Sequence, residues 1–200
     1  DVYRTLRSTA DGSYREKGSR FLAFAFPVEG EEQSTTILRE LKRKYHDARH
    51  ICYAWVIGEK GETYRVNDDG EPRHTAGDPI LNQIRSCEIT NVLVAVVRYF
   101  GGTKLGKPGL INAYKTAARD ALEKADIIEK YPEVKLRIHF DYEAMDEVMR
   151  FISERNLRLT GQQYGTEGHV EILLPESGSE EVMDLLRGIR MVKAVETLPC

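Results

Sequence analysis

The chain of 200 residues has little cysteine, no long apolar run and no excess of basic charge. Its three cysteines, Cys52, Cys87 and Cys200, lie far apart, without a C-x-x-C pair or a histidine cluster. This pattern argues against a disulfide framework and a zinc site, and it indicates a reducing compartment. No apolar stretch is long enough to span a membrane, and the first residues lack a signal-peptide profile. We therefore expect a cytoplasmic protein with no membrane partner.

The formal net charge of −3 does not by itself indicate a nucleic-acid partner, and we do not expect the protein to bind DNA. The charge is nevertheless uneven along the chain. Up to Lys130 there are 21 basic and 19 acidic residues, whereas from Tyr131 onward there are 8 basic and 13 acidic ones. The first part, at +2, is therefore a better candidate for binding an anion than the second part, at −5.

Apolar periodicity divides the chain near residue 131 and predicts two domains, 1–130 and 131–200, of an α+β protein. Alternating and continuous apolar runs predict strands in the first domain, and apolar residues at helical spacing predict helices. The strands are expected at 20–28, 51–57, 62–66 and 92–97, and the helices from about 34, around 80–84 and from about 110 to 125.

The second domain shows the pattern strand-helix-strand-strand-helix-strand. Its strands are expected at 135–142, 157–164, 169–174 and 192–198, with helices at 144–156 and 179–189. This βαββαβ order is that of the split βαβ, or ferredoxin-like, plan.

A glycine-rich run from Tyr99 to Tyr114 precedes the last predicted helix of the first domain. Glycines allow a ligand to approach the backbone closely, and a helix start leaves free N–H groups, so the run is a candidate anion cradle. It has the glycine and lysine spacing of a P-loop, but Pro108 replaces the magnesium-binding hydroxyl. The adjacent pair Gly101-Gly102 also breaks the dinucleotide fingerprint. The alternative is that these glycines serve tight turns and close packing.

A second cluster of polar residues runs from Asn67 to Pro79. Its three carboxylates, on Asp68, Asp69 and Glu71, could bind a hard cation or form an acid/base pair, with the imidazole of His74 as a further titrating group. The alternative is a solvated turn followed by a helix start that a Thr or Asp side chain caps.

His50 and Cys52 lie two residues apart in a predicted strand and therefore on the same face. A Cys–His pair is conceivable there, but no third residue that would orient it can be named. A core histidine beside a small buried thiol explains the same spacing.

The two clusters together resemble the YigZ/IMPACT family. The resemblance rests on the segments DDGEP, TAGDPIL, VRYFGG, LG, GL and AY between residues 68 and 114, with KGSRF at 17–21 and the run containing His50, Cys52 and Tyr53. It covers the whole chain, because the ferredoxin-like tail is similar to that of bacterial members. His74 and Pro108 depart from the family pattern, which has glycine at both positions, and Pro108 removes one amide donor from the cradle.

The resemblance implies a first domain like domain 2 of ribosomal protein S5, an α/β sandwich with helices on one side of the sheet. It implies a second domain similar to the last domain of elongation factor G, which suggests contact with RNA or the ribosome. Eukaryotic relatives act in translational control by competing for a scaffold of the amino-acid-starvation kinase. The family supplies no established catalytic residues, and no cofactor is expected.

These observations favour a non-enzymatic regulatory protein that is linked to translation and binds RNA, the ribosome or a translation-associated protein. The candidate binding residues are Asp68, Asp69, Glu71, His74, Thr75, Arg98, Tyr99, Gly101, Gly102, Lys104, Gly106, Lys107 and Tyr114. Arg73 and Lys115 are further candidates for phosphate contacts, and Tyr99 or Phe100 for a stacking face. The alternative is a metal-dependent hydrolase or phosphate-handling enzyme that uses Asp68, Asp69, Glu71 and His74. A protein-interaction scaffold is a third possibility.

Overall fold

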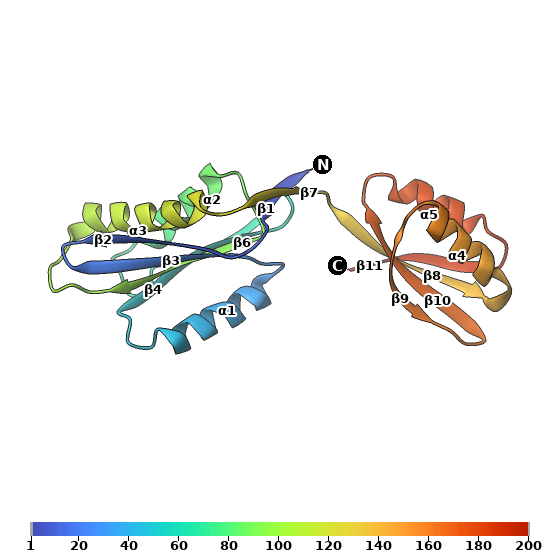
Figure 1. Ribbon diagram of the computed structural model, residues 1–200, viewed down its shortest axis with the longest axis horizontal. Coiled ribbons are helices and arrows are strands. Elements are labelled where there is room, and N and C mark those ends of the chain that lie inside the picture. Colours follow the sequence, from blue (N-terminus) through green and yellow to red (C-terminus); the bar gives the residue numbers. More distant parts are fainter. Residues whose placement is uncertain (1, 200) are drawn as a thin grey trace. The chain divides into compact units, whose positions relative to one another are not determined.

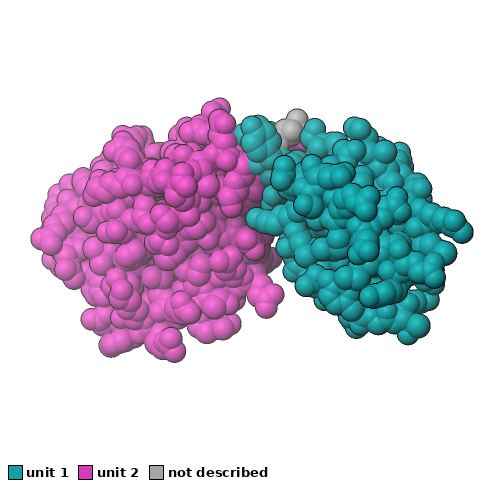
Figure 2. Space-filling model, turned by 45° about the vertical axis from the view of Figure 1, so that its right-hand side comes forward, with its two compact units in different colours: residues 1–2, 131–200 teal, residues 3–130 magenta. Residues whose placement is uncertain are grey.

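The computed structural model describes residues 2–199 and divides the chain into two compact units. The N-terminal unit comprises residues 3–130, and the C-terminal unit comprises residues 131–199 together with Val2 (Figure 2). Each unit has its own core of buried apolar side chains. No helix in the described part of the chain is both long and apolar enough to cross a bilayer.

The N-terminal unit is built on a five-stranded antiparallel sheet. Its central strand, β6 (Val92–Tyr99), is buried at every residue except the last, which explains its near-continuous apolar sequence. The strands follow the order β2 (Ala10–Glu16), β3 (Ser19–Pro27), β6, β4 (His50–Ile57) and β5 (Thr63–Asn67).

Helices cover both faces of this sheet, so the expectation of helices on one side only is wrong (Figure 1). Helices α2 (Gly77–Ser86) and α3 (Gly106–Glu123) pack on one face. Helix α1 (Glu31–Lys44) packs on the other, where its apolar side chains meet Trp55 and Leu93.

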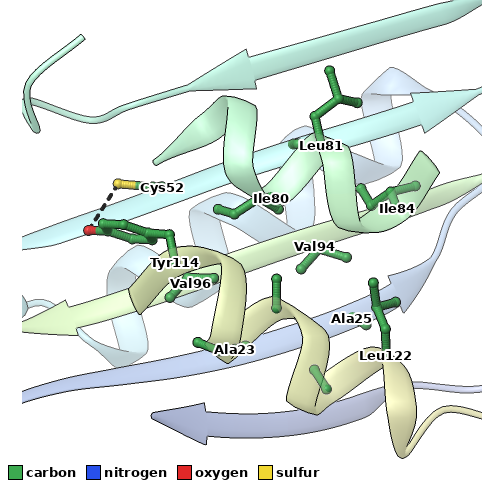
Figure 3. Close-up of a cluster of buried hydrophobic side chains, with 14 of the residues drawn as sticks. Ala23, Ala25, Cys52, Ile80, Leu81, Ile84, Val94, Val96, Tyr114 and Leu122 are labelled. Atoms are coloured by element: carbon green, nitrogen blue, oxygen red, sulfur yellow. Dashed lines mark hydrogen bonds between the residues drawn. The ribbon is translucent and has the colours of Figure 1, made fainter. Parts of the chain in front are cut away.

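Small side chains bring α3 close to the sheet. Ala113, Ala117 and Ala121 are fully buried against it. A Cβ placed on Gly12 of β2 would lie 2.3 Å from the backbone nitrogen of Ala121, so only glycine allows this approach. Figure 3 shows the neighbouring part of the core, where Ile80 and Ile84 of α2 lie over the sheet.

Two short strands, β1 (Tyr3–Leu6) and β7 (Ile127–Lys130), form a separate antiparallel ribbon. They pair the beginning of the N-terminal unit with its end. Neither strand is expected from periodicity, because four residues are too few to display an alternation.

The C-terminal unit contains a four-stranded antiparallel sheet with two helices on one face (Figure 1). Buried residues of both helices share a core with Ile138 and Phe140 of β8. The elements are β8 (Glu133–Asp141), a 3-10 turn η1 (Tyr142–Ala144), α4 (Met145–Glu154), β9 (Arg158–Gln163), β10 (Glu167–Pro175), α5 (Ser179–Arg187) and β11 (Val192–Leu198). In the sheet the strands follow the order β11-β8-β10-β9.

The other face of this sheet carries charged side chains that pair with one another. Glu171 on β10 accepts from Lys135 Nζ at 2.7 Å and from Arg137 Nη2 at 2.6 Å. The hydrogen bonds from Lys135 and then Arg137 lower the pKa of Glu171 from 4.5 to about 2. Ion pairs with Glu171 on the same face therefore neutralise much of this positive charge.

Candidate anion-binding cleft

The loop between β5 and α2 carries the acidic cluster, and its first carboxylate caps a helix. Asp68 Oδ1 accepts from the backbone N–H groups of Ala76 at 3.2 Å and Gly77 at 2.8 Å. Its Oδ2 accepts from the N–H of His74 at 3.0 Å. Because the first N–H groups of a helix lack partners within the helix, a carboxylate there stabilises α2. Both carboxylate oxygens of Asp68 are thus engaged in hydrogen bonds with backbone N–H groups.

The second carboxylate is also committed to the backbone. Asp69 Oδ2 accepts from the N–H of Ile51 at 2.7 Å, which ties the loop to the start of β4. Among the described residues there is no group of three or more His, Cys, Asp and Glu side chains that could hold a metal ion. Backbone N–H groups thus hold both Asp68 and Asp69.

The third carboxylate, Glu71, is buried in a polar cluster of its own. Its Oε1 accepts from Arg98 Nη1 at 2.5 Å and from the hydroxyl of Tyr114 at 2.7 Å. His50 Nε2 lies 3.7 Å from the same oxygen. Burial raises the pKa of Tyr114 far above its ordinary value, so its hydroxyl stays a neutral donor. Glu71 therefore holds Arg98 in place with a charge-assisted hydrogen bond.

Cys52 is not paired with His50. Its Sγ lies within hydrogen-bond distance of two acceptors, the backbone oxygen of Asp68 at 3.1 Å and the hydroxyl oxygen of Tyr114 at 3.4 Å (Figure 3). His50 instead directs its Nδ1 at the backbone oxygen of Asp69, 2.6 Å away. Burial raises the pKa of Cys52 well above its usual range, so no nucleophilic thiolate forms there. The thiol is part of the core.

The acidic loop and the glycine-rich run meet in one cleft of the N-terminal unit, with a volume of about 360 Å³. Glu71 lies on its wall as the one carboxylate among its lining residues. Four cationic side chains also line it, those of Arg49, Arg98, Lys104 and Lys107. With His50 taken as neutral, the lining carries a formal charge of +3, which favours an anion.

The cleft also has an apolar wall. Phe100 is 45% exposed, and the guanidinium groups of Arg49 and Arg98 lie 5.8 and 5.6 Å from the centre of its ring. These distances fall within the range of cation–π contacts. Pro72, Leu105 and Leu110 complete the apolar lining. The cleft can therefore offer a planar ring and cations to the same ligand.

The first turn of α3 closes one side of the cleft. Leu105, the residue before the helix, makes no capping hydrogen bond with its side chain, and the first turn has no acidic residue. Gly106 has a φ of +71°, a backbone conformation that favours glycine. Pro108 lacks an N–H, so the amides of Gly106 and Lys107 are the donors at this helix start.

The first two glycines of the run have structural roles. A Cβ on Gly101 would lie 2.0 Å from the backbone carbon of Gly18, so the run and the β2–β3 turn are in direct contact. The N–H of Gly101 donates to Ser19 Oγ at 3.1 Å, and Arg98 Nη2 lies 3.5 Å from the same oxygen. Gly102 has a φ of +90°. Tight turning and close packing thus account for this pair.

Several candidate residues lie outside the lining of the cleft. His74 is exposed and pairs with Asp78, whereas Thr75 is buried and donates to a backbone oxygen. The hydroxyl of Tyr99 donates to Asp47 at 2.9 Å. Lys115 lines a different groove, between α2 and α3.

Sequence reasoning missed Arg49 and did not assign His50 to a binding site. Both reach the cleft through strand pairing, because His50 on β4 lies opposite Arg98 on β6. The N–H of Arg49 donates to the backbone oxygen of Arg98 at 2.9 Å. No local pattern near residue 49 signals this long-range pairing.

Comparison with known proteins gives a consistent set of relatives. Residues 17–122 match the Impact N-terminal domain family. IMPACT family member YvyE of Bacillus subtilis is 29% identical over 198 residues, which cover 97% of this chain and 91% of that protein. IMPACT family member YigZ of Escherichia coli is 28% identical over 186 residues, 90% of this chain and 91% of that protein. The crystal structure of a hypothetical protein that is 24% identical in sequence aligns with a TM-score of 0.74 over 100% of this chain and 98% of the other chain. This match shows a similarity of fold.

Proposed function

Because the chain belongs to the Impact N-terminal domain family, we propose that it is a translation-linked regulatory protein that acts by binding RNA. In this proposal the cationic cleft of the N-terminal unit holds an RNA phosphate. The link to translation comes from the resemblance to this family, because it implies that the eukaryotic members act in translational control. The observation that carries the choice of ligand is the lining of the cleft, with four cationic side chains and one carboxylate.

The chemistry of the cleft supports RNA over an uncharged ligand. Lysine and arginine side chains and free helix-terminal amides are the groups with which proteins hold phosphate. An exposed aromatic ring beside them offers a stacking surface for an unpaired base, a recurrent feature of single-strand recognition. Phe100 stands at that position, next to Arg49.

The folds of the two units extend the proposal. We propose that the N-terminal unit is of the ribosomal protein S5 domain 2 type and that the C-terminal unit is ferredoxin-like, similar to the last domain of elongation factor G. The βαββαβ order of the C-terminal unit and its strand order β11-β8-β10-β9 support the second assignment. Such folds suit a protein that meets the ribosome or a translation-associated protein, although a fold by itself does not define a function.

The test is the affinity of the full chain for a short single-stranded RNA, measured by fluorescence anisotropy over a range of salt concentrations. We expect binding at low salt that weakens steeply as salt rises, because cations released from the RNA drive such binding. Lys104→Ala together with Lys107→Ala should weaken binding by roughly tenfold or more. The salt slope should fall by about 1 for each phosphate that the variant no longer neutralises.

Lys115→Ala is the matched control, because Lys115 lies on the same helix but lines another groove. It should bind RNA like the unchanged protein. Absence of binding at low salt would contradict the proposal, and so would an equal loss of affinity in the Lys115 variant.

A further inference from the structure

The cleft presents more positive charge than one phosphodiester can neutralise. We propose that it recognises a terminal phosphate, a phosphomonoester at the end of a single-stranded RNA, and does not primarily hold the diester backbone. This inference rests on the proposed function of the same cleft and names the part of the RNA that enters it.

The first argument is charge. A phosphodiester carries one negative charge, whereas a phosphomonoester carries about −1.5 to −2 at neutral pH and has three strong acceptor oxygens. The lining has a formal charge of +3 with His50 neutral, because Glu71 offsets only one of the four cations. Moreover, Glu71 is already engaged by Arg98 and Tyr114, which leaves Arg49, Lys104 and Lys107 for the ligand.

The second argument is the convergence of donors from two elements. Gly106 and Lys107, in the first turn of α3, both line the cleft, and Lys107 brings an ammonium group. Arg98 lines the cleft from β6, and its side chain is only 6% exposed. Its Nε is buried and has no hydrogen-bond partner among the described residues. A guanidinium group from a strand and the start of a helix thus line the same cleft, an arrangement that favours an anion.

The third argument is size. A volume of about 360 Å³ lies at the lower end of the range for small-molecule sites, roughly 300 to 1,000 Å³. It has room for one nucleotide and excludes a duplex. Phe100 provides an aromatic wall for the base of that nucleotide, beside the guanidinium group of Arg49. A chain end, with one phosphate and one base, therefore matches the cleft better than an internal segment.

The experiment compares RNAs of one sequence that differ only at their ends: a 5′-phosphate, a 3′-phosphate, or hydroxyl groups at both ends. Inorganic phosphate and a phosphoserine peptide serve as competitors. We expect an RNA with a terminal phosphate to bind the full chain roughly tenfold more tightly than the hydroxyl form, as a charge-assisted contact would give. The 5′ and 3′ forms identify which end is read.

The preference should disappear in the Lys104→Ala, Lys107→Ala variant and persist in Lys115→Ala. Equal affinity for phosphorylated and hydroxyl RNA would overturn this inference while leaving the proposed RNA binding intact. If no RNA binds, the proposed function itself fails. Displacement of RNA by the phosphoserine peptide at lower concentration than by phosphorylated RNA would overturn the inference in favour of a protein ligand.

Discussion

At Glu71 a single carboxylate oxygen receives hydrogen bonds from Arg98 and Tyr114, and the ring of His50 lies nearby. This residue joins the acidic loop to the strand and the helix that form the cleft. It also has two opposing effects on the protein. Its charge stabilises a buried guanidinium, yet the same charge reduces the positive potential that would attract an anion.

Replacement of Glu71 by glutamine should separate these two effects. We expect Glu71→Gln to lower the free energy of unfolding by about 3 kcal/mol, because it leaves Arg98 buried without its counter-charge. RNA should nevertheless bind the folded variant more tightly at low salt, since the cleft loses its one carboxylate. Urea unfolding and fluorescence anisotropy measure the two quantities.

Glu40→Gln, a change at an exposed position of α1, is the control and should alter stability by less than about 0.5 kcal/mol. Weaker RNA binding by folded Glu71→Gln would contradict the role assigned to this carboxylate.

At the scale of the elements, the position at which α3 begins determines which of its residues line the cleft. Periodicity predicts a helix from about residue 110, but the helix begins at Gly106, so its first turn includes Lys107 and Pro108. Proline is tolerated in the first turn, where its missing N–H is not needed. The helix start therefore lies at the cleft, and Lys107 is part of a helix instead of a loop.

The contact between the glycine-rich run and the β2–β3 turn should be intolerant of any side chain. Gly101→Ala would place a Cβ 2.0 Å from the backbone of Gly18, so the backbone must shift. We expect a decrease of about 1–3 kcal/mol in the free energy of unfolding, as overpacking usually causes. Gly30→Ala is the matched control, because nothing lies within 4 Å of the added carbon there. Similar stabilities of the two variants in urea unfolding would contradict tight packing of the run against this turn.

At the scale of the whole molecule, charge distinguishes the two units. Residues up to 130 carry a formal charge of +2 and include the cationic cleft, whereas those from 131 onward carry −5. In the C-terminal unit the charges on the open face of the sheet pair with one another around Glu171. The cleft lined by four cationic side chains lies in the N-terminal unit, which is why we assign ligand binding to it.

The ion pairs of Glu171 predict how stability depends on pH. Because the folded-state pKa of Glu171 is lowered from 4.5 to about 2, this carboxylate stabilises the folded state above pH 4.5. That contribution is lost as the pH falls from 4.5 toward 2. As the pH falls from 4.5 toward 2, the stability of Glu171→Gln should therefore decrease less than that of the unchanged protein. Thermal unfolding at several pH values measures this difference. Glu176→Gln, a change at an exposed position, is the control and should show the same pH dependence of stability as the unchanged protein. The same pH dependence in Glu171→Gln would contradict the stabilising role of the Glu171 ion pairs.

Much of the fold could be predicted from local patterns, and most of the cleft could not. Strands β4 and β6 have apolar sequences that reveal them, and the alanine spacing of α3 predicts its close packing. Strand β2 escapes prediction because its sequence, ADGSYRE, combines edge-strand alternation with residues that disfavour strands. The cleft depends on the pairing of β4 with β6, which joins residues about fifty positions apart and has no signature in either segment.

Nuclear magnetic resonance of the full chain, isotopically labelled on nitrogen and titrated with single-stranded RNA at low salt, tests the central claim most directly. The claim is that the cationic cleft of the N-terminal unit binds an RNA phosphate. It predicts that the largest changes in amide chemical shift occur at Gly106, Lys107 and their neighbours in the cleft, and that they saturate as the RNA is added. Shifts confined to residues 131–199, or a saturating titration that leaves the start of α3 unchanged, would contradict the claim.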